Sequence, residues 1–109
     1  MLEGLFGNRT AEKVLVYIEN YDRGHIRGIA ECFSISPSQV QKQLVRLEAA
    51  GVLASRLSGK TREFTFNPRF AFLPELRAML KKAISLLPPA ERKLYLALRT
   101  RPRRTGKTL

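Results

Sequence analysis

Four consecutive residues, Ser36-Pro37-Ser38-Gln39, constrain the fold of this chain more than any other segment. Serine is a preferred helix N-cap, and proline fits the first helical position because its missing N–H is not needed there. Glutamine three residues after the serine completes a capping box. These signals predict a helix over 37–50 that ends at Gly51. Only Ser34-Ile35-Ser36 separates it from a second apolar segment with helical spacing, over 25–33, and two helices joined so closely form a helix-turn-helix.

The flanking segments complete a recognisable architecture. Thr10 is a good N-cap for a helix that runs to Tyr21 and repeats its apolar residues on one face. After Gly51 the hydrophobic period shortens, and two short runs over 52–57 and 62–66 surround a turn that contains glycine. We therefore predict a mainly α fold with a small β-hairpin. It is a winged helix-turn-helix with a three-helix core and a two-stranded wing over 52–66, followed by C-terminal helices.

The C-terminal part predicts a further helix over 73–87 and a short one over 90–98. The first has an apolar stripe at helical spacing, formed by Leu73, Leu76, Leu80, Ala83, Ile84 and Leu87. The stripe can pack on the protein's own core or pair with its copy in a homodimer, and its seam-like spacing favours dimerisation through Leu73, Leu76, Leu80, Ile84 and Leu87. The expected organisation is a winged helix-turn-helix domain over 5–70, a helical extension over 71–98 and a basic, mobile tail over 99–109.

Charge is the most informative part of the composition. Twenty Lys and Arg residues against nine Asp and Glu give a net charge of +11. Residues 1–31 carry four basic and five acidic groups, whereas residues 73–109 carry ten basic and two acidic groups. Such an excess indicates a polyanionic partner, with nucleic acid as the first expectation and an anionic membrane surface as the second.

The predicted helix 37–50 has the residues that a DNA-reading helix needs. Val40, Leu44 and Leu47 recur at spacings of four and three and anchor one face on the core. The other faces carry base-reading candidates, because Gln pairs with adenine, Lys or Arg with guanine, and Ser with either. These candidates are Ser38, Gln39, Gln41, Lys42 and Arg46, while Val45 lies among them. Near the tip of the wing, Arg56, Lys60 and Arg62 are expected to contact phosphates or the minor groove.

Other chemistries find little support in the sequence. Cys32 and His25 are the only cysteine and histidine, too few for a zinc site, and we interpret Cys32 as a small buried residue. No catalytic constellation or phosphate-binding glycine motif is present, so we expect neither an enzyme nor a cofactor or metal. No apolar run approaches the ~20 residues of a membrane span, and the start does not look like a secretory signal. The expected location is the cytoplasm.

The stretch 29–53, IAECFSISPSQVQKQLVRLEAAGVL, resembles winged-helix regulators of the ArsR/MarR kind. These typically have an alanine in the second helix, a serine-capped recognition helix and a Leu-Glu-x-x-Gly-hydrophobic segment that leads into the wing. The chain is more similar still to a bacterial and archaeal subgroup of ArsR-like domains that are encoded with, or fused to, a nucleotidyltransferase. The segments that carry this likeness are LFGNRT at 5–10, REFTFNP at 62–68 and LPELR at 73–77.

The resemblance covers about residues 5–87 and implies DNA binding through the helix and wing residues named above. The cysteine-containing motif of metal-sensing ArsR members is not matched, because Cys32 stands alone. The catalytic nucleotidyltransferase signature is absent as well. The resemblance therefore implies double-stranded DNA as a partner, and any such enzyme would be a separately encoded partner.

Two other functions compete with regulation by DNA binding. A winged helix can dock on another protein, in which case the charge serves solubility alone. It can also bind RNA, although the aromatic residues that would stack unpaired bases fall mostly on predicted core faces. Substitution of Gln41 and Lys42 discriminates among these functions, because only a DNA-reading helix loses sequence preference without them.

Overall fold

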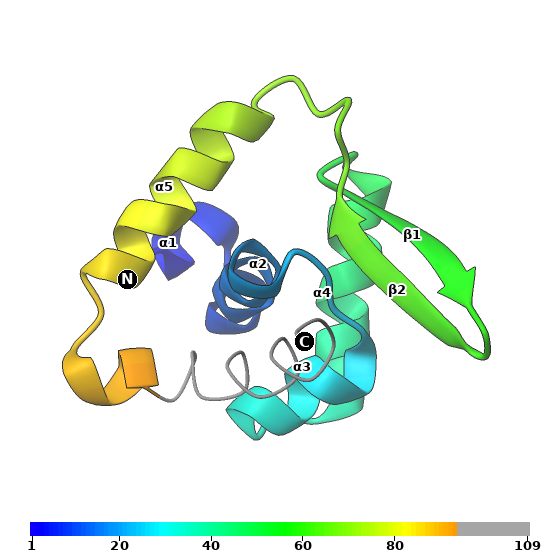
Figure 1. The fold of residues 1–109 in the computed structure, drawn as a ribbon, viewed down its shortest axis with the longest axis horizontal. Helices are drawn as coiled ribbons and strands as arrows, with labels where there is room; N and C mark the ends of the chain where they lie inside the picture. Colours follow the sequence, from blue (N-terminus) through cyan, green and yellow to red (C-terminus); the bar gives the residue numbers. More distant parts are fainter. Residues whose placement is uncertain (94–109) are drawn as a thin grey trace, which may run out of the picture.

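The computed structural model describes residues 1–93, and its helices surround a central helix, α2, with a hairpin on one side (Figure 1). The elements in chain order are α1 (Glu3–Phe6), α2 (Arg9–Tyr21), α3 (Ile26–Phe33), α4 (Pro37–Ala49), β1 (Leu53–Ser58), β2 (Thr61–Phe66) and α5 (Leu73–Ser85). Residues 89–93 are also helical. Among these described helices, none has the length and apolar character that a membrane crossing requires. The predicted fold class, a helical core with a two-stranded wing, is confirmed.

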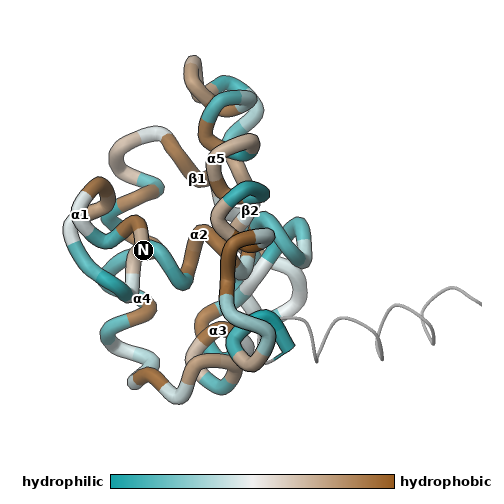
Figure 2. Tube along the Cα trace, turned by 90° about the vertical axis from the view of Figure 1, so that its left-hand side faces the viewer, coloured by the Kyte–Doolittle hydropathy of each residue, from teal (hydrophilic) through white to brown (hydrophobic). Residues whose placement is uncertain are grey.

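The core is a single cluster to which every main element contributes. α2 contacts α1, α3, α4, α5 and β2, so most of its circumference is covered. Leu15, Leu44, Leu53 and Leu80 come from four different elements, and none of them is more than 1% exposed. Burying each such side chain contributes roughly 1.5–3 kcal/mol. Figure 2 shows the same division along α4 and α5, where hydrophobic and hydrophilic residues alternate as expected of helices with one buried face.

The predicted boundaries of α4 are confirmed to within a residue. Ser36 is the N-cap, and its Oγ accepts a hydrogen bond from the backbone N–H of Gln39 at 3.3 Å, with Pro37 in the first turn. At the other end, Gly51 has a φ of 85°, a left-handed conformation that glycine adopts without a steric penalty. The N–H of Val52 then donates to the carbonyl of Leu47 at 3.0 Å, which directs the chain into β1.

The hairpin is antiparallel, with Leu53 opposite Phe66 and Ser58 opposite Thr61, so Gly59 and Lys60 form the turn. Gly24, between α2 and α3, adds a short bridge to Phe64 through two backbone hydrogen bonds of 2.9 and 2.8 Å. A Cβ at Gly24 would lie 3.0 Å from atoms of Ile29 and Tyr17, which explains why a glycine stands where the chain passes so close. The bridge was not predicted, and it attaches the base of the wing to the helical core.

The N-terminal region differs from the sequence-based prediction. α2 begins at Arg9, and its N-cap is Asn8, whose Oδ1 accepts from the N–H of Ala11 at 2.7 Å. The prediction of Thr10 as the cap was therefore wrong. The short helix α1 was not predicted either, and it ends at Gly7, where φ is 95°.

α5 packs against the protein's own core, which is the alternative that the sequence left open beside dimerisation. Leu76, Leu80 and Leu87 are buried, and Leu73 and Ile84 are partly buried against the same core. Three of the five side chains are therefore covered in the single chain, while Leu73 and Ile84 keep part of their surface exposed. The predicted helix 90–98 is described only as far as residue 93, and the predicted tail 99–109 lies outside the described residues.

Candidate nucleic-acid interface

The outer face of α4 carries polar side chains that are open to solvent. Ser38, Gln39, Gln41, Lys42 and Arg46 are all exposed, while Val40, Leu44 and Leu47 are buried. At 3.6 residues per turn, Ser38, Lys42, Val45 and Ala49 follow one line along the helix opposite the buried residues, and Gln41 lies beside it. Burial of the opposite face holds this row at a defined height above the core.

Arg46 occupies a position that differs from that of the other polar residues of α4. Its Nη2 donates to the backbone carbonyl of Phe6 at 2.9 Å, and its Nε donates to Oε1 of Gln43 at 2.9 Å. The guanidinium therefore caps the C-terminal end of α1 and joins that helix to α4. Charged side chains satisfy helix-terminal carbonyls in this way because those groups have no partner within the helix.

The three basic residues of the wing lie in three different settings. Lys60 is at the turn and exposed. Arg62 is on the strand face that also carries Phe64 and Phe66, because side chains two residues apart share a face. Arg56 is on the opposite face, where its Nε lies 3.3 Å from Oε1 of its cross-strand neighbour Glu63.

A chain of hydrogen bonds joins the wing to the end of α4. Nη1 of Arg62 donates to Oγ of Ser55 at 3.0 Å, and that hydroxyl donates to Oε2 of Glu48 at 2.7 Å. Glu48 and Ser55 are half-buried, so the bond between them is less screened than the exposed bond from Arg62. Sequence reasoning did not single out Ser55, and it used Glu48 only as part of the Leu-Glu-x-x-Gly segment that leads into the wing.

Behind this surface, a carboxylate is held in the core. Glu19 has a side chain that is only 3% exposed, and its Oε1 accepts from Nε of Arg77 at 2.8 Å. Nζ of Lys81 lies 3.9 Å from its other oxygen. The hydrogen bond with Glu19 raises the pKa of Arg77, and the guanidinium also lies 5.2 Å from the ring centre of Phe66. Arg77 therefore connects α5 with both α2 and the base of the wing.

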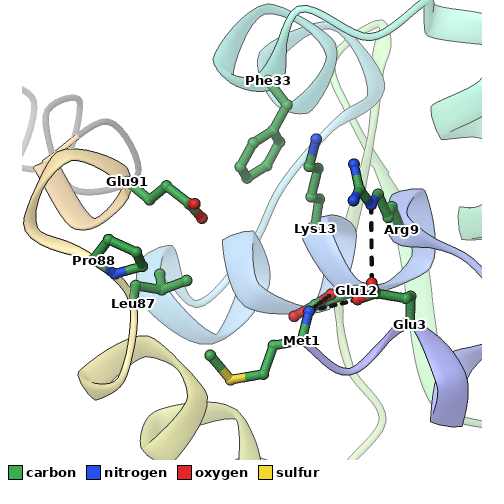
Figure 3. Close-up of a pocket in the computed structure, with 9 residues that line it drawn as sticks. All are labelled: Met1, Glu3, Arg9, Glu12, Lys13, Phe33, Leu87, Pro88 and Glu91. Atoms are coloured by element: carbon green, nitrogen blue, oxygen red, sulfur yellow. Dashed lines mark hydrogen bonds and ion pairs between the residues drawn. The ribbon is translucent and has the colours of Figure 1, made fainter.

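A pocket lies among the N-terminal segment, α2, the end of α3 and the residues that follow α5 (Figure 3). Its charged residues have both signs, because Glu3, Glu12 and Glu91 face Arg9 and Lys13. Nε of Arg9 lies 3.9 Å from Glu3, and Nζ of Lys13 lies 5.8 Å from the ring centre of Phe33. No residue of α4 or the wing lines this pocket, so it is separate from the surface described above.

The described residues contain no group of three His, Cys, Asp or Glu side chains that could hold a metal ion. Cys32 is buried in the core, and burial raises the pKa of its thiol. His25 caps α3 by accepting from the N–H of Gly28 at Nδ1, at 3.2 Å. Both side chains therefore have structural roles in this fold.

No protein-family model matches the sequence, and no curated protein matches it. Solved structures match it along nearly its whole length. The YusO protein from Bacillus subtilis has 21% identity and a TM-score of 0.58, with 95% of this chain and 79% of that one covered. A MepR mutant from S. aureus, bound to an oligodeoxyribonucleotide, has 17% identity and a TM-score of 0.54, covering 97% and 84%. A MarR family transcriptional regulator from Silicibacter pomeroyi has 21% identity and a TM-score of 0.52, covering 90% and 76%. The chain therefore has a fold similar to that of MarR-type winged helices.

Proposed function

We propose that this chain is a sequence-specific, double-stranded DNA-binding transcriptional regulator, with α4 in the major groove and the wing on the backbone or in the minor groove. The observation that carries the proposal is the exposed face of α4. It presents Ser38, Gln41 and Lys42 from a helix whose opposite face is buried. The major groove of B-DNA admits one α-helix, and these side chains suit base edges there. The oligodeoxyribonucleotide bound to the MepR mutant supports a DNA partner for this fold.

Roles within the site follow from the setting of each residue. Gln41 has the chemistry for adenine and Lys42 that for guanine or a phosphate, while Ser38 and Gln39 lie where the helix begins. In the wing, Lys60 at the turn is best placed for phosphates. Arg62 bonds to Ser55 and Arg56 pairs with Glu63, so both residues stabilise the hairpin, and we assign them a smaller role at the phosphates. Arg46 positions α1 against α4, and its role at DNA is secondary in this proposal.

The net charge of +11 supports the same partner, because cationic side chains gain affinity for DNA by releasing its condensed counterions. A homodimer remains part of the proposal, since two copies on a palindromic site add their contacts. A separately encoded nucleotidyltransferase partner rests only on the resemblance of the sequence to ArsR-like domains. No contact surface described above argues for that enzyme.

Fluorescence-anisotropy titration of the full chain tests the proposal. The ligand is a duplex obtained by binding-site selection from random DNA, compared with a scrambled duplex across a salt series. We expect the selected duplex to bind at least ~10³-fold more tightly near physiological salt. Gln41→Ala and Lys42→Ala should each weaken binding to it by roughly 5- to 150-fold, because a good base contact contributes about 1–3 kcal/mol. Neither should alter binding to the scrambled duplex by as much.

Lys82→Ala is the matched control, since it removes one positive charge from an exposed position on α5, away from α4. Lys60→Ala should weaken binding to both duplexes alike and reduce the salt slope by about 0.9. Equal binding of both duplexes, at low salt only, would contradict the proposal and redirect the search to protein partners. Tighter binding to single-stranded or duplex RNA would instead favour the RNA-binding function.

A further inference from the structure

Val45 is an apolar side chain in the middle of an otherwise polar helix face. It is 52% exposed, whereas the apolar residues Val40 and Leu44 of the same helix are completely buried. Helical spacing places Gln41 and Lys42 next to it in the preceding turn and Ala49 in the following one. Packing within the chain therefore does not explain a valine at this position.

Arg46, the second basic candidate of α4, is engaged away from the line of exposed residues that contains Val45. The Arg46 guanidinium donates to the carbonyl of Phe6 and to Gln43, at 2.9 Å in both cases, on the side of the helix that faces α1. The guanine-reading side chain that the sequence offers at the centre of α4 is therefore held away from the outer line. The groups left there are the Val45 methyls and the Lys42 ammonium, with the Gln41 amide beside them.

The major groove contains one apolar group that a valine can meet, the C5 methyl of thymine. Gln41 lies four residues before Val45, a rise of about 6 Å along the helix, and stacked base pairs are about 3.4 Å apart. Two such side chains therefore reach base pairs one or two steps apart. We propose that Val45 contacts a thymine methyl and that, together with an adenine contact of Gln41, it makes α4 a reader of A·T-containing steps. This inference rests on the proposed function.

Replacement of thymine by deoxyuridine tests the contact directly, because it removes the C5 methyl and leaves every hydrogen-bonding group of the base pair in place. Each thymine of the selected duplex is replaced in turn, and the affinity of the full chain is measured by anisotropy. We expect one position in each half-site where the replacement weakens binding about fourfold, the value of burying one methylene-sized group.

Variants assign that effect to Val45. Val45→Ser removes both methyls and should reduce the thymine-to-deoxyuridine ratio at that position to nearly one. Val45→Thr keeps one methyl and should retain part of the ratio. Leu86→Ser is the matched control, because Leu86 is also exposed, at 59%, but lies beyond α5. It should leave the fourfold ratio unchanged. Circular dichroism confirms that each variant is folded.

The outcomes separate this inference from the function on which it rests. If a selected duplex depends on Gln41 and Lys42 but no thymine shows a ratio that Val45→Ser abolishes, the inference is wrong and DNA reading stands. If that ratio persists in Val45→Ser, the methyl is read by another residue and the inference is again wrong. If no duplex is selected over scrambled DNA, both the Val45 contact and sequence-specific DNA binding are wrong.

Discussion

Tyr17 shows how burial of one polar group enters the stability of the fold. Its ring packs 4.5 Å from that of Tyr21 and 6.3 Å from that of Phe33, measured between centroids. Its hydroxyl oxygen lies 3.3 Å from the point where a Cβ on Gly28 would stand, so glycine there leaves room for the phenol. Burial disfavours the charged phenolate and raises the pKa of Tyr17 from 10.0 to about 12.

Stability is therefore expected to fall in alkaline solution. Between pH 10 and 12 the unfolded chain loses the Tyr17 proton while the folded chain keeps it, so rising pH favours unfolding. In Tyr17→Phe the free energy of unfolding should fall by about 1 kcal/mol less over this pH range. The difference is smaller than the full pKa shift implies, because the half-buried phenol is partly screened by solvent. Urea unfolding of both proteins at pH 8 and pH 11.5 measures this difference in the free energy of unfolding. Cys32 titrates in both proteins, so an identical pH dependence in the two would contradict the role of Tyr17.

Individual exposed residues of α4 were predictable from the sequence, and their contacts were not. The apolar period of α4 alone places Ser38, Gln41 and Lys42 on the outer face, as the structure has them. The contact of Arg46 with the carbonyl of Phe6 spans forty positions and leaves no local pattern. The same holds for the bonds from Arg62 through Ser55 to Glu48, which depend on how the wing folds back on the helix.

The bounds of an element with several coincident signals follow closely from the sequence, whereas the cap of α2 and the side on which α5 packs do not. α4 has a cap, a proline and a glycine stop, so its bounds follow from the sequence. At the start of α2, Asn8 and Thr10 are both capable caps, and the left-handed end of α1 at Gly7 decides for Asn8. The spacing of the stripe on α5 favoured a dimer seam, although a core face has the same helical period. Only the position of α2 opposite it shows that it packs inward.

The packing of α5 on α2 includes a buried charge whose loss should be costly. Arg77→Met keeps the length and apolar stem of the side chain but leaves the Glu19 carboxylate with Lys81, 3.9 Å away. We expect a loss of roughly 2 kcal/mol, below the ~3–5 kcal/mol of a fully buried pair, because Arg77 is 36% exposed.

Urea unfolding followed by circular dichroism measures this loss, with Lys82→Met on the same helix as the exposed control. The double variant Arg77→Met with Glu19→Gln should recover part of it, since no unpaired carboxylate then remains in the core. A loss in Arg77→Met no larger than that in Lys82→Met would show that the ion pair contributes little.

At the scale of the whole molecule, Leu76, Leu80 and Leu87 are buried within one chain, so a homodimer would have to form through other residues. We expect sedimentation at micromolar concentration to give twice the 12.4-kDa chain mass, because a single recognition helix offers few base contacts. Leu80→Ala should lower stability without a specific effect on association, since that side chain lies in the core. A monomer mass at this concentration would contradict the homodimer and predict a single, non-palindromic half-site.

The bond between Glu48 and Ser55 joins α4 to the wing, and the backbone bridge from Gly24 to Phe64 attaches the wing to the helical core, so both limit how far the wing can move from α4. α4 and the wing, attached to each other in this way, do not adjust independently to a DNA duplex. A duplex bound by both must therefore bring its major groove and adjacent backbone to that separation, and sequences that bend or narrow easily do so at the lowest energetic cost. Base pairs that no side chain touches would then influence affinity through the mechanical properties of the DNA itself.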